Sequence, residues 1–156
     1  MIDIREGRCA CGAVRYRLHG APMFVHCCHC TDCQRETGSA FAINALYEAD
    51  RTELLAGTTE AVATPSASGQ GQTIHRCPAC HVALWSHYAG AGEAVTFVRA
   101  GTLEEVATLA PDIHIYTRSK LPWVVLPESV PAVEEYYSPK AMWPAESQAR
   151  WKAARG

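Results

Sequence analysis

Eight cysteines, grouped in three short segments, constrain this 156-residue chain more than any other feature of its sequence. The groups are Cys9 with Cys11, a segment at 27–33 that holds four cysteines, and Cys77 with Cys80. A disulfide stabilises most when it closes a long loop, so disulfide frameworks spread their cysteines along the chain. Cysteines two or three positions apart instead offer two thiolates to one ion. We therefore expect metal ligands, while the even cysteine count keeps a disulfide framework open as an alternative.

The composition excludes several classes of function. The formal net charge is -2, so no basic surface for nucleic acid is expected. No apolar run approaches the roughly 20 residues that a spanning helix needs, and the N-terminus lacks the basic and apolar regions of a secretory signal. Thiols persist in a reducing compartment, where disulfides are rare. We expect a cytoplasmic protein that engages neither nucleic acid nor membrane.

Alternation of apolar and polar residues predicts seven or eight short strands. The clearest follows the first cysteine pair, where Val14, Tyr16 and Leu18 alternate with arginines. The segment 41–47 repeats the period of two, although 40–46 could also form a helix. Weaker or shorter strands are expected at 54–55, 60–64, 73–77, 82–88, 95–100 and 113–116, with a surface loop at 65–72. This pattern predicts a mainly β fold of short antiparallel strands.

One or two short helices complete the expected structure. Thr31 has the position of an N-cap in a capping box with Gln34, and Gly38 would end that helix. A second helix is expected at 145–154, where good helix formers gather.

Neither a repeat nor a linker interrupts the sequence. We therefore expect a single domain that spans residues 1–156. Its core would cover about 4–127, and the tail at 128–156 could be helical.

The first and last cysteine groups together form a predicted structural metal site. Cys9 and Cys11 precede a glycine, and Cys77 and Cys80 enclose a proline turn. Two such turns supply four thiolates, the closed tetrahedral set typical of structural zinc. His81 stands where a glycine would more easily follow the turn, although His tolerates left-handed backbone better than most residues.

The central group predicts a second, open metal site. On an extended segment Cys28 and Cys30 share a face, Cys27 and His29 point the other way, and Cys33 follows through a turn. Three thiolates could then hold one ion and leave a fourth position for water or substrate, as in catalytic zinc sites. Other arrangements stay open: Cys27 in place of Cys28, all four cysteines in a second structural site, a nitrogen ligand from His26 or His29, or a redox pair of Cys30 and Cys33.

Three cysteine motifs and two downstream segments resemble the glutathione-dependent formaldehyde-activating enzyme family, also represented in centromere protein V. They are GRCACGAVRY at 7–16, CHCTDCQRETGSAF at 28–41, CPACHVAL at 77–84, PDIHI at 111–115 and KLPW at 120–123. The resemblance implies a β-tent-like fold with two zinc ions, a structural one on Cys9, Cys11, Cys77 and Cys80 and a catalytic one on Cys28, Cys30 and Cys33. The sequence departs from the family pattern at two positions: His81 replaces the usual glycine, and Cys27 adds a thiol beside the catalytic cluster.

The family's activity implies condensation of glutathione, as co-substrate, with formaldehyde to S-(hydroxymethyl)glutathione, a carbon–sulfur lyase reaction in reverse. Another thiol adduct could be the substrate. A non-catalytic, zinc-stabilised module that binds glutathione or protein is the alternative function, and a homodimer is an open expectation.

Further residues are weaker candidates for the site. Arg35 could bind a glutathione carboxylate, and the backbone at Ser39 could line the pocket. His114 alternates with isoleucines and is expected on the opposite face of its strand. Trp123 is expected in the core.

Overall fold

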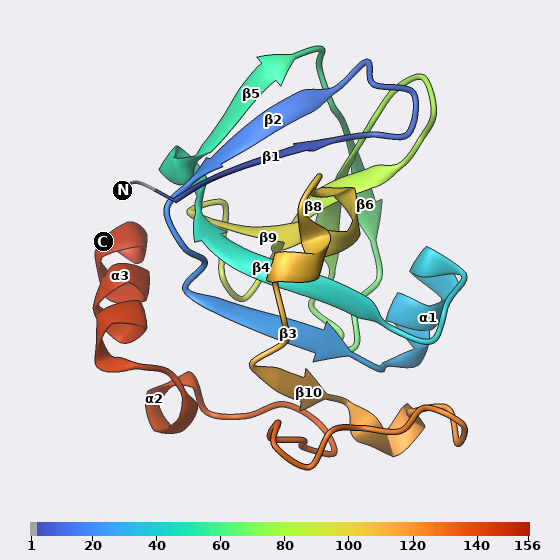
Figure 1. The fold of residues 1–156 in the computed structure, drawn as a ribbon, viewed down its shortest axis with the longest axis vertical. Helices are drawn as coiled ribbons and strands as arrows, with labels where there is room; N and C mark the ends of the chain where they lie inside the picture. Colours follow the sequence, from blue (N-terminus) through green and yellow to red (C-terminus); the bar gives the residue numbers. More distant parts are fainter. Residues whose placement is uncertain (1–2) are drawn as a thin grey trace.

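The computed structural model describes residues 3–156, in which ten strands form two sheets (Figure 1). The smaller sheet has the order β1-β2-β5, with β1 (Ile4–Arg8), β2 (Arg15–His19) and β5 (Thr52–Ala56). The larger sheet has the order β10-β3-β4-β9-β8-β7-β6. Its strands are β3 (Phe24–Cys28), β4 (Ala42–Glu48), β6 (Glu60–Thr64), β7 (Gln72–Arg76), β8 (Ala83–Tyr88), β9 (Val95–Arg99) and β10 (Ile113–Ile115).

Helical segments are few and short. Within residues 3–156 the α-helices are α1 (Thr31–Thr37), α2 (Pro139–Met142) and α3 (Ala145–Arg155). Single 3-10 turns occur at η1 (Ala49–Arg51), η2 (Ala100–Thr102), η3 (Val106–Thr108) and η4 (Thr117–Ser119). None of the helices in this part of the chain has the length and apolar character needed to cross a membrane.

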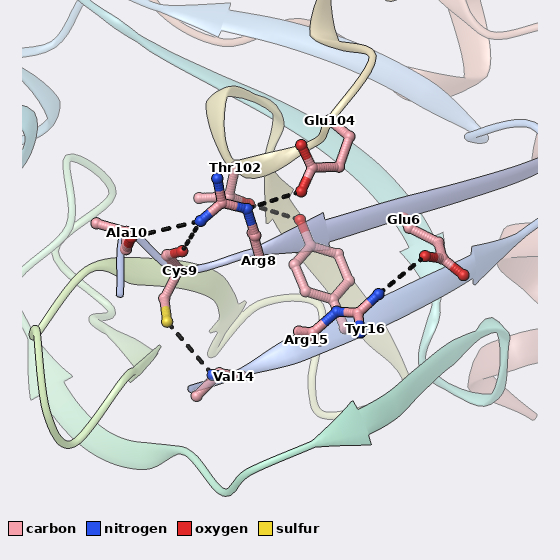
Figure 2. A network of polar contacts seen from close by, with 9 residues as sticks. All are labelled: Glu6, Arg8, Cys9, Ala10, Val14, Arg15, Tyr16, Thr102 and Glu104. Atoms are coloured by element: carbon pink, nitrogen blue, oxygen red, sulfur yellow. Dashed lines mark hydrogen bonds and ion pairs between the residues drawn. The ribbon is translucent and has the colours of Figure 1, made fainter. Parts of the chain in front are cut away.

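The two sheets pack face to face around one apolar core. Tyr16 and Leu18 of β2 are fully buried while Arg15 and Arg17 face outward, as the alternation predicts. They pack against Ala45, Tyr47 and other apolar residues of the larger sheet. Gly7 lies against the Tyr16 ring, so closely that an added Cβ would come within 2.4 Å of the ring. The Tyr16 hydroxyl and Thr102 Oγ1 share a 2.5 Å hydrogen bond. Figure 2 shows this part of the smaller sheet, with the ion pairs of Arg8 with Glu104 and of Arg15 with Glu6.

The other face of the larger sheet carries a second core, which the C-terminal tail covers. Side chains alternate along β3 and β4, so Phe24 and Leu46 belong to this core while their neighbours belong to the first. The Trp143 ring stacks on Phe24 at 5.6 Å, and the Ser147 hydroxyl donates to the carbonyl of Met23 at 2.6 Å. Figure 1 shows α3 and α2 at the left of the view, beside the ends of β4 and β3.

Most predicted elements are confirmed, and some expectations need correction. The mainly β fold is confirmed, and 40–46 contributes to strand β4 rather than a helix. β10 pairs with β3 in parallel, so the sheets are not entirely antiparallel. The sequence pattern missed β1 and β3, while α2 lies within the tail at 128–156 that could be helical. Trp123 is 71% exposed, so its expected place in the core is wrong.

Candidate functional site

Two tight turns bring Cys9, Cys11, Cys77 and Cys80 together between the sheets' ends. Their four sulfur atoms lie within 4.8 Å of one another. The Sγ atom of Cys11 lies 3.5 Å from that of Cys9 and 3.7 Å from that of Cys77. Tetrahedral ligands at the ~2.3 Å of a zinc–sulfur bond are separated by about 3.8 Å, so the spacing of the donor set fits zinc. The distances exclude disulfides here, and all eight cysteines of residues 3–156 are free.

Backbone N–H groups point at the sulfur atoms of this cluster. The amide of Val14 donates to Cys9 Sγ at 3.3 Å, as Figure 2 shows, and that of Cys80 donates to Cys77 Sγ at 3.5 Å. Hydrogen bonds from the backbone amides of Val82 and Cys11 lower the pKa of the Cys80 thiol to about 6. The second turn therefore stabilises the thiolate of Cys80, the form that binds a metal.

His81 completes the second turn in the left-handed conformation. Its φ is 63°, and its amide donates to the Cys77 carbonyl at 2.9 Å. The position therefore requires the backbone that glycine adopts most easily, and His carries it here.

The second cluster forms where β3 runs into α1. Cys28 ends the strand, Cys30 caps the helix and Cys33 lies in its first turn, and their sulfur atoms lie within 4.8 Å of one another. The Cys33 amide donates to Cys30 Sγ at 3.3 Å. Hydrogen bonds from the Cys28 and Cys33 thiols and from backbone amides lower the pKa of Cys30 to about 3, so this cluster holds a thiolate.

The helix cap differs from the one that the sequence predicts. Cys30, rather than Thr31, is the N-cap: its sulfur accepts the hydrogen bond from the Cys33 backbone amide that a side-chain hydroxyl would usually accept. Gln34 does not close a capping box; its side-chain amide donates to the carbonyls of His29 at 3.0 Å and Ser119 at 2.9 Å. Gly38 ends the helix in the left-handed conformation, as expected.

Cys27 faces away from the second cluster. It lies with His29 and His114 on the other face of β3, where β10 pairs His114 with Cys27. Cys27 Sγ lies 3.6 Å from His29 Nε2, which lies 2.9 Å from His114 Nδ1. Burial lowers the pKa of His29 to about 4 and lowers that of His114, so this chain of contacts is neutral. The expected opposite orientation of Cys27 and Cys28 is confirmed, and Cys27 does not close the second cluster.

Arg99 places a buried positive charge beside the second cluster. The residue is 6% exposed, and within residues 3–156 no carboxylate pairs with it. Its guanidinium donates to Asn44 Oδ1 and to Gln72 Oε1 (3.5 Å), while its Nε has no partner. The pKa of Cys33 is raised overall to about 12: its hydrogen bond with Cys28 lowers it, its hydrogen bond with Cys30 and its burial raise it, and the nearby charge of Arg99 opposes the rise. A buried cation without a carboxylate requires another anion nearby, and a thiolate cluster supplies one.

A cavity of about 350 Å³ opens onto the second cluster. Cys28, Cys30 and Cys33 line it, and so do His26 and Asn44 from the neighbouring strand positions. His26 bonds through Nε2 to the Tyr137 hydroxyl, and burial lowers its pKa to about 3, so the ring is neutral. The sulfur atoms are therefore accessible to a small molecule, although the cysteines themselves are buried.

The two residues considered for glutathione do not reach this cavity. Arg35 and Ser39 are exposed on α1 and after it, and neither lines the cavity. His114 belongs to the opposite face of the sheet. Lys120 donates to the carbonyl of Val124 at 2.7 Å and so shapes its own loop.

Sequence reasoning missed several residues that build the site. Asn44 and Arg99 are polar residues within strands that are mostly apolar and buried. A polar residue in such a strand was the one sequence signal that could have identified them. Tyr136, Pro139 and Trp151 line the cavity from the tail, more than 100 positions from the cysteines in sequence. No local pattern connects such distant segments.

Comparisons with known proteins identify similar sequences and one partly similar structure. A family model described as "Glutathione-dependent formaldehyde-activating enzyme" matches residues 4–119. A Halomonas elongata protein, named provisionally as a glutathione-dependent formaldehyde-activating enzyme, is 30% identical over 157 residues, which cover 97% of this chain and 96% of that protein. A crystal structure of a Rhodobacter sphaeroides protein aligns with 82% of this chain and 99% of its own, at 17% identity and a TM-score of 0.48.

Proposed function

Because the chain belongs to the glutathione-dependent formaldehyde-activating enzyme family, we propose that it interconverts S-(hydroxymethyl)glutathione with glutathione and formaldehyde as a zinc-dependent carbon–sulfur lyase. One observation carries the proposal: three cysteine sulfur atoms converge at the wall of a cavity that a small molecule can enter. A closed structural site would use all its ligand positions, whereas three protein ligands leave one for substrate.

The donor atoms of both clusters fit zinc. Cys9, Cys11, Cys77 and Cys80 would hold a structural ion, and Cys28, Cys30 and Cys33 a second one. Thiolate sets favour zinc over magnesium, calcium or manganese. Three thiolates around a divalent ion leave a net negative charge, and the buried guanidinium of Arg99 is positioned to balance it.

Zinc in such a site lowers the pKa of a bound thiol and polarises a carbonyl. The chain's own residues would position the reactants. Asn44 accepts from Arg99 through Oδ1, which leaves its side-chain N–H groups to donate to the oxygen of the aldehyde or of the adduct. The apolar walls of the cavity would exclude bulk water, which strengthens these polar contacts.

We also propose a cytoplasmic location. The seven cysteine ligands of the two sites must remain reduced thiols, and a reducing compartment keeps them so.

The test is the rate of exchange between S-(hydroxymethyl)glutathione and its components, measured by NMR near equilibrium with zinc-loaded protein. Wild type should accelerate exchange above the uncatalysed rate, and Cys30→Ser should abolish the acceleration while retaining the fold. Cys27→Ser is the matched control, since this neighbouring thiol lies on the other face of β3 and should retain activity. Exchange no faster than the uncatalysed rate with wild type would refute the proposed reaction.

A further inference from the structure

The cavity beside the three-cysteine cluster has an aromatic wall. Strands of the larger sheet contribute part of this wall, and segments from residue 116 onward contribute the rest. Its apolar members are Tyr88, Phe97, Ile115, Tyr116, Tyr136 and Trp151. The rings contact one another, with Tyr88 edge-on to Phe97 at 4.6 Å and Tyr116 tilted towards Tyr136 at 6.5 Å. Such a surface gains free energy by covering an apolar or aromatic group.

The rest of the cavity wall is polar but almost uncharged. The loop between β6 and β7 supplies hydroxyl and amide groups, among them Ser66, Ser68 and Gln70. Within residues 3–156 no lysine or arginine lines the cavity, and apart from the cysteine cluster Asp32 is its one formally charged residue. The peptide portion of glutathione carries two carboxylates and an ammonium group, whose burial against aromatic rings without partners would be costly. That portion is therefore expected along the polar loop and the cavity mouth.

This arrangement leaves the aromatic wall for the other half of the adduct. In S-(hydroxymethyl)glutathione the other half is a single carbon with a hydroxyl group. The cavity of about 350 Å³ includes both the polar loop and the aromatic wall, and one carbon covers little of that wall. With formaldehyde as the aldehyde, the aldehyde part of the adduct would leave most of the aromatic wall uncovered.

We propose that this site takes the glutathione adduct of an aromatic aldehyde, whose ring lies against the aromatic wall of the cavity. The inference rests on the proposed lyase function and narrows its substrate class. In the forward step the thiol sulfur adds to the aldehyde carbon, the carbonyl π bond becomes a C–O single bond, and the thiol proton ends on the new hydroxyl. The reverse step breaks the same S–C bond and returns the aldehyde and the thiol, so no oxidant or reductant is needed.

Two stable thioethers test the inference without relying on turnover. S-benzylglutathione and S-methylglutathione share every charged group and differ only in the substituent that corresponds to the aldehyde. Isothermal titration of the zinc-loaded full chain should show at least fivefold tighter binding of the benzyl compound, because its ring buries apolar area that the methyl group lacks. A preference below fivefold, or no binding of either compound, would overturn the inference.

Two variants on the loop between β8 and β9 locate the ring. Ala91 is buried and lines the cavity, so Ala91→Phe should fill the space and remove the preference for the benzyl compound. Ala89 is exposed and lies outside this cavity, so Ala89→Phe should keep the preference. A preference that survives Ala91→Phe would refute the assignment to this wall. If Ala91→Phe fails to fold, the wild-type ratio decides.

The exchange of S-(hydroxymethyl)glutathione on the same sample separates the two claims. Accelerated exchange without a benzyl preference would retain the lyase and overturn the aromatic substrate class. A benzyl preference without accelerated exchange would retain the aromatic ligand class and refute the proposed formaldehyde reaction.

Discussion

Replacing Arg150 by methionine should destabilise the protein through one buried carboxylate. Arg150 in α3 forms a two-pronged ion pair with Glu48 at the end of β4, Nε to Oε1 and Nη2 to Oε2, both at 2.7 Å. The side chains are 16% and 10% exposed. Without Arg150, the Glu48 carboxylate would keep only Arg51, whose Nε is 3.6 Å away. The variant therefore removes the main partner of Glu48 and leaves the Glu48 carboxylate charge largely shielded from water.

The expected cost is about 3 kcal/mol, since two hydrogen bonds to a charged group are lost and each contributes about 1.5–3 kcal/mol less the residual Arg51 contact. For a chain of this length that corresponds to a fall in Tm of about 6–12 °C. Arg118→Met is the matched control, because Arg118 pairs with Glu135 at 2.6 Å but the side chains are 60% and 65% exposed. An exposed pair contributes less than about 1 kcal/mol, so its Tm should fall by under about 4 °C.

Thermal unfolding of the zinc-loaded variants by circular dichroism measures both costs. Burial would raise the pKa of Glu48, but the hydrogen bonds from Arg150 outweigh it and lower that pKa. A lowered carboxyl pKa stabilises the fold above the unfolded value of about 4.3 and loses that contribution as the pH falls through the folded value. The Arg150→Met deficit should therefore be constant near neutral pH and shrink below about pH 4, relative to Arg118→Met. Equal losses for the two variants would refute the reasoning.

Three further outcomes follow from the clusters and turns. Cys27→Ser should leave the bound zinc unchanged in elemental analysis, because its sulfur faces away from both clusters; loss of one equivalent would place it among the ligands. Cys77→Ser should lose one equivalent of zinc and much of the stability in urea, since four thiolates are expected to hold the structural ion; full zinc content would contradict that site. Gly57→Ala should cost about 3 kcal/mol in urea unfolding, because φ is 77° and the new Cβ would lie 2.3 Å from the Ala13 carbonyl oxygen. Gly69→Ala, with φ 79° and open space around it, should cost about 1 kcal/mol; equal costs would show that the contact with Ala13 does not matter.

Strands with one exposed face could be predicted from the sequence, and strands buried on both faces could not. β2 alternates between buried and outward-facing residues, so its period of two is visible. β3 is buried at all five positions, and its run of Phe, Val, His and Cys has no such period. β1 was missed for the opposite reason: four of its five residues are at least partly exposed, which leaves little apolar pattern.

The clusters were predictable to the extent that ligand spacing is local. Each pair of neighbouring cysteines indicates its own turn, and the face shared by Cys28 and Cys30 follows from strand geometry. The cap on α1 was wrong because sulfur at Cys30 replaced the usual hydroxyl. Arg99 and the tail residues escaped notice because their role depends on contacts between distant segments, such as His26 with Tyr137 across 111 positions.

Because side chains alternate along β3, the register of this strand decides which of two neighbouring cysteine thiols faces the cavity. Cys27 and Cys28 have the same side chain and adjacent positions, so only the face each occupies decides which one meets a substrate. A slip of one residue against β4 would exchange them and bring the histidine pair's partner into the cavity. β3 is held against such a slip from both sides, by five paired positions with β4 and three with β10. The choice between the two thiols would then be made during folding, when β3 pairs with β4 and β10 in the correct register.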